Sequence, residues 1–131
     1  MSTTDFSEFK SLFVATARKH LENIRTALSS LKKNTGDKDA MNNIYIAAHS
    51  LKGESLAMGY MTNSAVSQLI EKIFHAAKDG SLTLTDPILT TTLQSVEKLS
   101  DSIDCVEKED KECILTDEQM SLEKVSGISL G

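Results

Sequence analysis

The chain has 131 residues, of which 40% are hydrophobic and 25% charged, and its formal net charge is -5. This length suits one domain that buries a core of its own without cross-links. The net negative charge argues against a nucleic-acid partner, because contact with a phosphate backbone needs an excess of basic residues. No apolar run is long enough to span a bilayer, and the start lacks the pattern of a signal peptide. Cys105 and Cys113 lie outside any metal-ligand spacing and indicate a reducing compartment, so we expect a cytoplasmic protein without a metal site.

Two amphipathic helices are predicted in the first half of the chain. In the first, apolar residues recur at steps of three and four positions and so share one face. They are Phe6, Phe9, Phe13, Ala17, Leu21, Ile24, Leu28 and Leu31. Asn34-Thr35-Gly36 supplies the stop, and a second helix runs from Asp37 to about Gly59. Its apolar and small inward positions are Met41, Ile44, Ala48, Leu51, Ser55 and Met58.

Two further helices follow the same pattern. Thr62 or Asn63 can cap a third helix that Gly80 ends. The apolar face of this helix is Val66, Leu69, Ile70, Ile73, Phe74 and Ala77. Asp86-Pro87 resembles a cap followed by proline in the first turn, and it opens a fourth helix. The inward positions of that helix are Leu89, Leu93, Val96, Leu99 and Ile103.

Four amphipathic helices joined by short loops bury their apolar faces against one another. We therefore expect an all-α protein with an up-down-up-down antiparallel four-helix bundle over residues 1–104. Residues 105–131 are expected to form a charged tail, with residues 106–112 as a linker or a frayed helix end. A capping-box pattern at Thr116 and Gln119 predicts a short fifth helix over residues 117–126, closed by Gly127.

Residues 47–60 read A-A-H-S-L-K-G-E-S-L-A-M-G-Y and carry the main functional signal. This segment resembles the signature of histidine phosphotransfer domains, with His49, Leu51, Lys52, Gly53 and Gly59 in the matching places. The long first helix, the K-D-G-S-L-T-L-T link and the closing helix are most similar to the N-terminal phosphoacceptor domain of chemotaxis histidine kinases. The resemblance covers roughly residues 5–104 and leaves the tail outside.

The spacing of the motif is consistent with phosphoryl chemistry. On a helix, His49 points away from the apolar stripe, and Lys52 and Gly53 are its neighbours on the next turn. Neutral imidazole is an adequate nucleophile near neutral pH, and it must be exposed for in-line transfer. Gly53 leaves room for a partner, and Lys52 offers a positive charge to phosphoryl oxygens. Tyr45 and Leu56 flank His49 on the exposed side and are candidates for the apolar part of a docking surface.

Glu71 is the candidate acceptor that orients the imidazole. It lies on the third helix, at about the depth where a side chain facing the second helix reaches the ring. The resemblance implies an orienting glutamate at this position of Q-L-I-E, whereas many relatives carry histidine where this chain has Gln68. Gln68 can still contribute a donor or acceptor to the site, but the simpler interpretation of this residue is a packing or surface position. Glu54 also departs from the family pattern and adds a carboxylate near the site. His20 and His75 are interpreted as surface residues.

The resemblance implies a phosphocarrier that is not itself an enzyme. A histidine kinase catalytic domain phosphorylates His49, and a response-regulator receiver domain takes the phosphoryl group onto an aspartate. The domain itself is expected to bind no cofactor, since ATP and Mg²⁺ belong to the partner kinase or receiver. The chain is expected to be the phosphoacceptor domain of a chemotaxis-type kinase, with a stand-alone phosphorelay protein as the alternative.

Two hypotheses from other functional classes stay open at this point. A metal-carboxylate bundle enzyme uses Glu-x-x-His pairs on inward faces, but Glu71 and His75 are four positions apart and the pair is not repeated. A structural adaptor would keep the helical bundle without any chemistry. The intact His-x-Leu-Lys-Gly motif argues against the adaptor.

Overall fold

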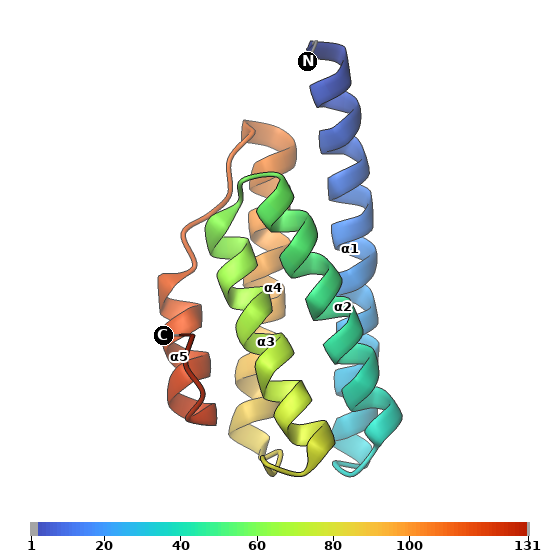
Figure 1. The fold of residues 1–131 in the computed structure, drawn as a ribbon, viewed down its shortest axis with the longest axis vertical. Helices are drawn as coiled ribbons and strands as arrows, with labels where there is room; N and C mark the ends of the chain where they lie inside the picture. The colour runs from blue at the N-terminus through green and yellow to red at the C-terminus, as the bar shows by residue number, and fades with distance from the viewer. Residues whose placement is uncertain (1–2, 131) are drawn as a thin grey trace.

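Five helices and no strand are present among residues 3–130, the part of the chain that the computed structural model describes (Figure 1). They are α1 (Thr3–Lys33), α2 (Lys38–Ala57), α3 (Met61–Asp79), α4 (Asp86–Glu109) and α5 (Thr116–Ser126). Helices α1 to α4 alternate in direction, and short loops join them in chain order (Figure 1). Helix α5 packs along α3 and α4. The predicted all-α bundle with a short fifth helix is therefore confirmed.

The core lies where the apolar faces of the four long helices meet. From Phe13 onward, the predicted inward positions of α1 are buried. Phe6 and Phe9 were predicted on the same inward face, but they are 45% and 50% exposed. The reason is that the N-terminal part of α1 extends beyond the other helices (Figure 1), so the other helices cover it only in part. Leu93 of α4 is also exposed, because it lies at the outer edge of the contact between α1 and α4.

The N-caps of three helices differ from those predicted, whereas the predicted glycine ends are present. Helix α3 begins at Met61 with Tyr60 as its N-cap, so neither Thr62 nor Asn63 caps it. Helix α4 is capped by Thr85, whose hydroxyl accepts a hydrogen bond from the N–H of Ile88. Helix α5 has no side-chain cap, so the predicted capping box is wrong. Gly80 and Gly127 end their helices in the left-handed conformation, as expected.

Much of the charged tail predicted over residues 105–131 is helical and packs on the bundle. Helix α4 continues past residue 104 to Glu109, because Val106 is fully buried and holds the last turns on the bundle. The predicted linker from residue 106 therefore begins about one turn later. Leu115 and Leu122 are buried as α5 packs on α3 and α4. That residues 1–104 form a separate folding unit stays a prediction. Among the described residues, no helix is both long and apolar enough to cross a membrane.

Candidate phosphoacceptor site

His49 lies in the middle of α2, on the side of the helix that faces away from the core. At about 100° per residue, none of the buried positions of α2 shares its direction. Those positions are Ala40, Met41, Ile44, Ala47, Ala48, Leu51 and Ser55. The His49 side chain is 60% exposed. The predicted exposure of the imidazole is therefore present in the structure.

The imidazole of His49 is oriented by a carboxylate from the neighbouring helix. Its Nδ1 donates a hydrogen bond to Oε2 of Glu71 on α3. With the proton on Nδ1, the lone pair of the neutral ring is on Nε2. The nitrogen that is free to react is therefore Nε2, on a ring that solvent and a partner can reach.

Glu71 is a buried carboxylate that accepts hydrogen bonds from two side chains. Its side chain is only 11% exposed, and its Oε1 accepts a hydrogen bond from Nζ of Lys52 at 2.8 Å. Burial alone would raise the pKa of Glu71, but the hydrogen bonds and charges of Lys52 and His49 outweigh it. The pKa of Glu71 is held below its usual value. Glu71 is therefore an ionised acceptor at neutral pH.

Lys52 lies one turn after His49 and links the site to α3 in two ways. Its ammonium group contacts Glu71, and its backbone carbonyl accepts a hydrogen bond from Oγ of Ser64 at 3.1 Å. An ammonium group has three donors. Lys52 thus retains donors for a phosphoryl oxygen while it is paired with Glu71. Ser64 is a supporting residue that the sequence reasoning missed, because nothing in its local sequence distinguishes it.

The surface around His49 is open and partly apolar. A Cβ atom placed on Gly53 would meet no atom within 4 Å, so the space beside the imidazole is empty. The Tyr45 ring stacks on His49 with 6.3 Å between ring centroids, and it also contacts His75. Leu56, two turns after His49, is 53% exposed. The candidate docking residues therefore share one face with the imidazole.

Gln68 lies one turn before Glu71 on α3 and is half-buried. The hydrogen bonds among residues 3–130 include none between Gln68 and His49, Lys52 or Glu71. The structure thus brings together His49, Lys52 and Glu71 and leaves Gln68 outside their network. An orienting role for Gln68 stays a prediction.

Glu54 does not add its charge to the His49 site. Its carboxylate accepts a hydrogen bond from Oγ1 of Thr16 at 3.0 Å and contacts Nε2 of His20 at 3.0 Å, both on α1. His20 was interpreted as a surface residue, but its side chain is only 21% exposed because of this packing. No local pattern could predict this contact, since the partners lie 34 and 38 positions from Glu54.

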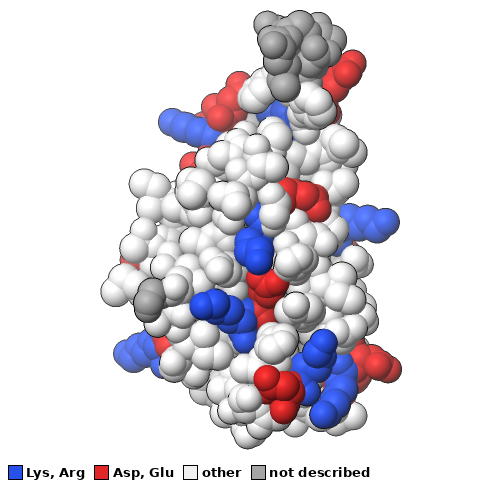
Figure 2. Space-filling model, in the orientation of Figure 1, with Lys and Arg blue, Asp and Glu red and all other residues white. Residues whose placement is uncertain are grey.

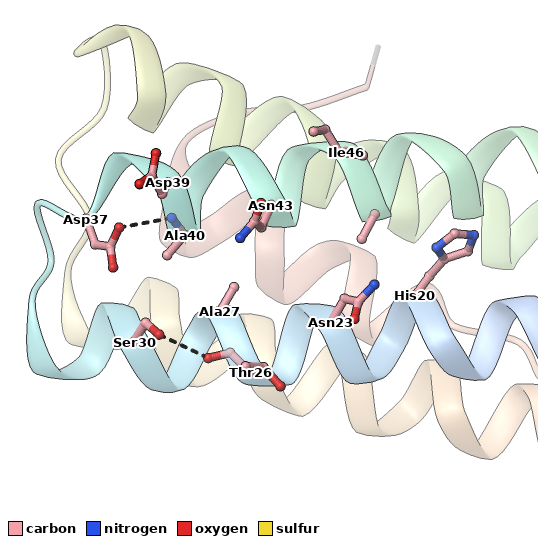
Figure 3. A pocket seen from close by; sticks show the side chains of 11 residues that line it. His20, Asn23, Thr26, Ala27, Ser30, Asp37, Asp39, Ala40, Asn43 and Ile46 are labelled. Atoms are coloured by element: carbon pink, nitrogen blue, oxygen red, sulfur yellow. Dashed lines mark hydrogen bonds between the residues drawn. The ribbon is translucent and has the colours of Figure 1, made fainter.

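On one face of the bundle, charged side chains lie along the line where α2 and α3 meet. In Figure 2, acidic and basic side chains follow one another down the middle of this face, and further charged side chains lie at its edges. A separate groove of about 520 Å³ lies between α1 and α2, on the other side of α2 (Figure 3). His20 lies at one end of this groove and Asp37 at the other, where Asp37 accepts from the N–H of Ala40 (Figure 3). None of its lining residues belongs to the His49 site.

The structure gives no support to the metal-carboxylate hypothesis. Among the described residues, no cluster of three or more His, Cys, Asp and Glu side chains is placed to hold a metal ion. Glu71 is directed at His49 and Lys52, whereas His75 is exposed and lies near Asp79.

The sequence of the chain is similar to those of known chemotaxis proteins. The chain is 26% identical over 102 residues to the chemotaxis protein CheA of Bacillus subtilis, which covers 78% of this chain. It is 25% identical over 97 residues to CheA of Halobacterium salinarum, which covers 74% of this chain. The chain spans only about 15% of the length of these relatives.

The fold has a solved counterpart. The phosphorylated P1 domain of CheA3 in complex with CheY6 from R. sphaeroides superposes with a TM-score of 0.80. The match covers 90% of this chain and 92% of that chain at 15% identity, so it shows a shared fold. The model of the Hpt domain matches residues 8–104, which include the whole His49 site. The chain belongs to the Hpt domain family.

Proposed function

We propose that His49 carries a phosphoryl group on Nε2, accepting it from a histidine kinase catalytic domain and passing it to an aspartate of a response-regulator receiver domain. The observation that carries the proposal is the hydrogen bond from Nδ1 of His49 to Glu71. It leaves the reactive nitrogen on the exposed edge of the ring. Membership of the Hpt domain family supports the same reading.

In the first transfer, the lone pair of Nε2 attacks the γ-phosphorus of ATP held by the kinase. The bond from phosphorus to the bridging oxygen breaks, and ADP leaves with that electron pair. The imidazole then carries a positive charge, and its Nδ1 proton stays on the hydrogen bond to Glu71. The buried carboxylate thus stabilises the charge that develops on the ring.

In the second transfer, an aspartate oxygen of the receiver attacks the phosphorus and the P–N bond breaks. The electron pair returns to Nε2, which restores the neutral ring. Lys52 lies one turn away, and its remaining donors stabilise phosphoryl oxygens during both transfers. Gly53 leaves the approach to the imidazole unobstructed.

The proposal makes this chain a phosphocarrier rather than an enzyme, with ATP and Mg²⁺ on its partners. The matches to several CheA proteins favour a place as the phosphoacceptor domain of a chemotaxis-type kinase. The crystallised relative is a P1 domain in complex with CheY6, which supports a CheY-like receiver as the partner. The cytoplasmic location expected from the sequence belongs to the same proposal.

The decisive experiment is incubation of the chain with a chemotaxis-type kinase catalytic domain and ATP labelled on the γ-phosphate. We expect a label that acid removes and base preserves, and that mass spectrometry places on His49. Addition of a CheY-type receiver should then remove the label from the chain. His49→Gln should abolish labelling.

The matched control is His75→Gln, which changes another exposed histidine close to Tyr45. This variant should be labelled like the wild-type chain. If His49→Gln is still labelled while its fold is intact, the proposal is wrong. A receiver that binds the chain equally with and without labelled His49, and never takes the group, would support the structural adaptor instead.

A further inference from the structure

The two cysteines of the chain lie side by side, although the sequence indicated a reducing compartment rather than a disulfide framework. Cys105 is near the end of α4, and Cys113 is in the segment between α4 and α5. Their Sγ atoms are 2.8 Å apart, and both residues are half-buried with free thiols. A disulfide bond is about 2.05 Å long. The two sulfur atoms therefore need to move by less than about 1 Å to bond.

Cys113 is held in place by hydrogen bonds on both sides of its backbone. Its N–H donates to Oγ of Ser102 at 2.9 Å, and its carbonyl accepts from Oγ1 of Thr62 at 2.8 Å. Ser102 is fully buried and donates in turn to Oδ1 of Asn63 at 2.7 Å. The proximity of the two thiols is therefore built into the packing of the tail on α3 and α4.

The residue before Cys113 connects this segment to the start of α3. The Glu112 carboxylate accepts hydrogen bonds from the N–H groups of Thr62 and Asn63, both at 2.9 Å. Helix α3 has no side-chain cap from Tyr60, so Glu112 supplies the missing acceptors. Glu112 directly precedes Cys113 in the chain. A covalent bond between Cys113 and Cys105 of α4 would therefore also keep the Glu112 carboxylate at the start of α3.

We propose that Cys105 and Cys113 are a reversible redox site, in which a hydroperoxide converts the two thiols into a disulfide that locks the 110–115 segment onto α3 and α4. This site lies outside the residues matched by the Hpt domain model. It does not depend on phosphoryl transfer at His49.

The chemistry takes two steps and balances with one peroxide. The hydrogen bond to Cys105, and then burial, raise the pKa of the Cys113 thiol to about 11. Cys113 therefore keeps its proton, and Cys105 is the nucleophile. Cys105 releases its proton and its sulfur attacks one peroxide oxygen, which gives a sulfenic acid and a hydroxide that takes up the released proton to form water. The Cys113 sulfur then displaces the sulfenic oxygen, which leaves as water. In total, two thiols lose two electrons and two protons, and H₂O₂ becomes two waters.

Such a bond suits a redox signal in a reducing compartment. Disulfides there are rare, and those that form are mostly transient and redox-sensing. A dithiol reductant returns both thiols by exchange. The closed loop spans residues 105–113 and restricts the unfolded chain, so the oxidised form should be the more stable one.

The test is a titration of the 131-residue chain with hydrogen peroxide after removal of reductant. We expect both free thiols to disappear together, the intact mass to fall by the mass of two hydrogens, and peptide mapping to join Cys105 to Cys113. Dithiothreitol should restore both thiols. The proposal is overturned if either thiol stays free, if separate sulfinic acids accumulate, or if the disulfides join different molecules.

Thermal unfolding and hydrogen exchange test the locking effect. Oxidation should raise Tm by about 5 to 10 °C in the wild-type chain and leave it unchanged in Cys105→Ser and Cys113→Ser. The amides of Thr62 and Asn63 should exchange more slowly in the oxidised chain, because Glu112 then stays on them. The locking role is overturned if the disulfide forms and neither quantity changes. The thiol count needs only the wild-type chain, so it decides the redox site even if a variant fails to fold.

Discussion

Lys52 donates a hydrogen bond from Nζ to Oε1 of Glu71 at 2.8 Å, which joins α2 to α3 beside the imidazole of His49. The second oxygen of the same carboxylate accepts from Nδ1 of His49. One buried glutamate therefore positions both the His49 imidazole, the proposed nucleophile, and the ammonium group of Lys52. Loss of its charge should affect the two side chains together.

Replacing Glu71 with glutamine should slow phosphorylation of His49 by about 10- to 100-fold. Glutamine can still accept the Nδ1 hydrogen bond, but it does not balance the positive charge of the phosphorylated ring. It also leaves Lys52 without its ionic partner. The measurement is the initial rate of labelling by the kinase domain at fixed ATP.

Glu54→Gln is the matched control for this prediction, because Glu54 lies on α2 near the site but contacts Thr16 and His20. Its labelling rate should stay within about twofold of the wild-type rate, since its charge plays no part in positioning His49. Equal rates for the wild-type chain and Glu71→Gln would contradict the role given to Glu71.

The stability of the chain should fall in acid partly through Glu71. Its pKa is held below the ordinary value of a glutamate, because the hydrogen bonds of Lys52 and His49 outweigh the effect of burial. For a carboxyl group whose pKa is depressed by folding, the stabilisation is complete above the unfolded-state pKa and is lost as pH falls through the folded-state pKa. The loss should therefore begin near the ordinary glutamate pKa and grow at lower pH.

Urea unfolding of the wild-type chain and Glu71→Gln between pH 7 and pH 3 measures this effect. The free energy of unfolding of the wild-type chain should approach that of the variant as the pH falls, because a protonated glutamate resembles glutamine. A difference between the two that is constant across this range would show that the Glu71 charge does not contribute.

The parts of the fold that the sequence predicts are those set by local periodicity. The apolar spacing predicts the four long helices, and the same helical geometry puts His49 on the exposed side of α2, one turn from Lys52. Glu71 was predicted to face His49 because antiparallel packing brings the two helices into register. The exposure of His49 follows from the turn of a helix alone, whereas the choice of Glu71 also rested on the family resemblance.

The parts that the sequence does not predict depend on contacts between distant residues. Glu112 caps α3 from about 50 positions away, so a search for caps next to the helix selects Thr62 and Asn63 instead. The exposure of Phe6 and Phe9 depends on how far the N-terminal end of α1 extends past the neighbouring helices (Figure 1). Periodicity shows which face of a helix is apolar, but it does not show where the partner helix ends.

Substitutions at Gly53 should change stability and phosphoryl transfer in opposite directions. A glycine inside a helix costs about 0.5–1 kcal/mol relative to alanine, and an added Cβ at this position meets no atom within 4 Å. Gly53→Ala should therefore raise the free energy of unfolding by about that amount. Urea unfolding measures the gain.

Gly53→Leu should slow transfer to a receiver by about 10- to 100-fold, because its side chain occupies the open surface beside His49 and displaces the partner. Stopped-flow transfer from the phosphorylated chain measures the rate. If Gly53→Leu transfers at the wild-type rate, the partner approaches His49 from another direction.

Replacing Glu112 with alanine should destabilise the whole bundle, although the residue lies in the charged tail outside the Hpt match. The two N–H groups at the start of α3 would lose their acceptors. Loss of a helix cap costs about 1 kcal/mol. The first turn of α3, the helix that carries Glu71, should therefore fray, and chemical unfolding should show the loss of stability.

The matched control is Glu109→Ala, which changes an exposed glutamate at the end of α4. Its free energy of unfolding should stay within about 0.5 kcal/mol of the wild-type value. Equal stability of the two variants would mean that water replaces the Glu112 carboxylate at no cost, and that the tail contributes to the bundle only through the buried Leu115 and Leu122.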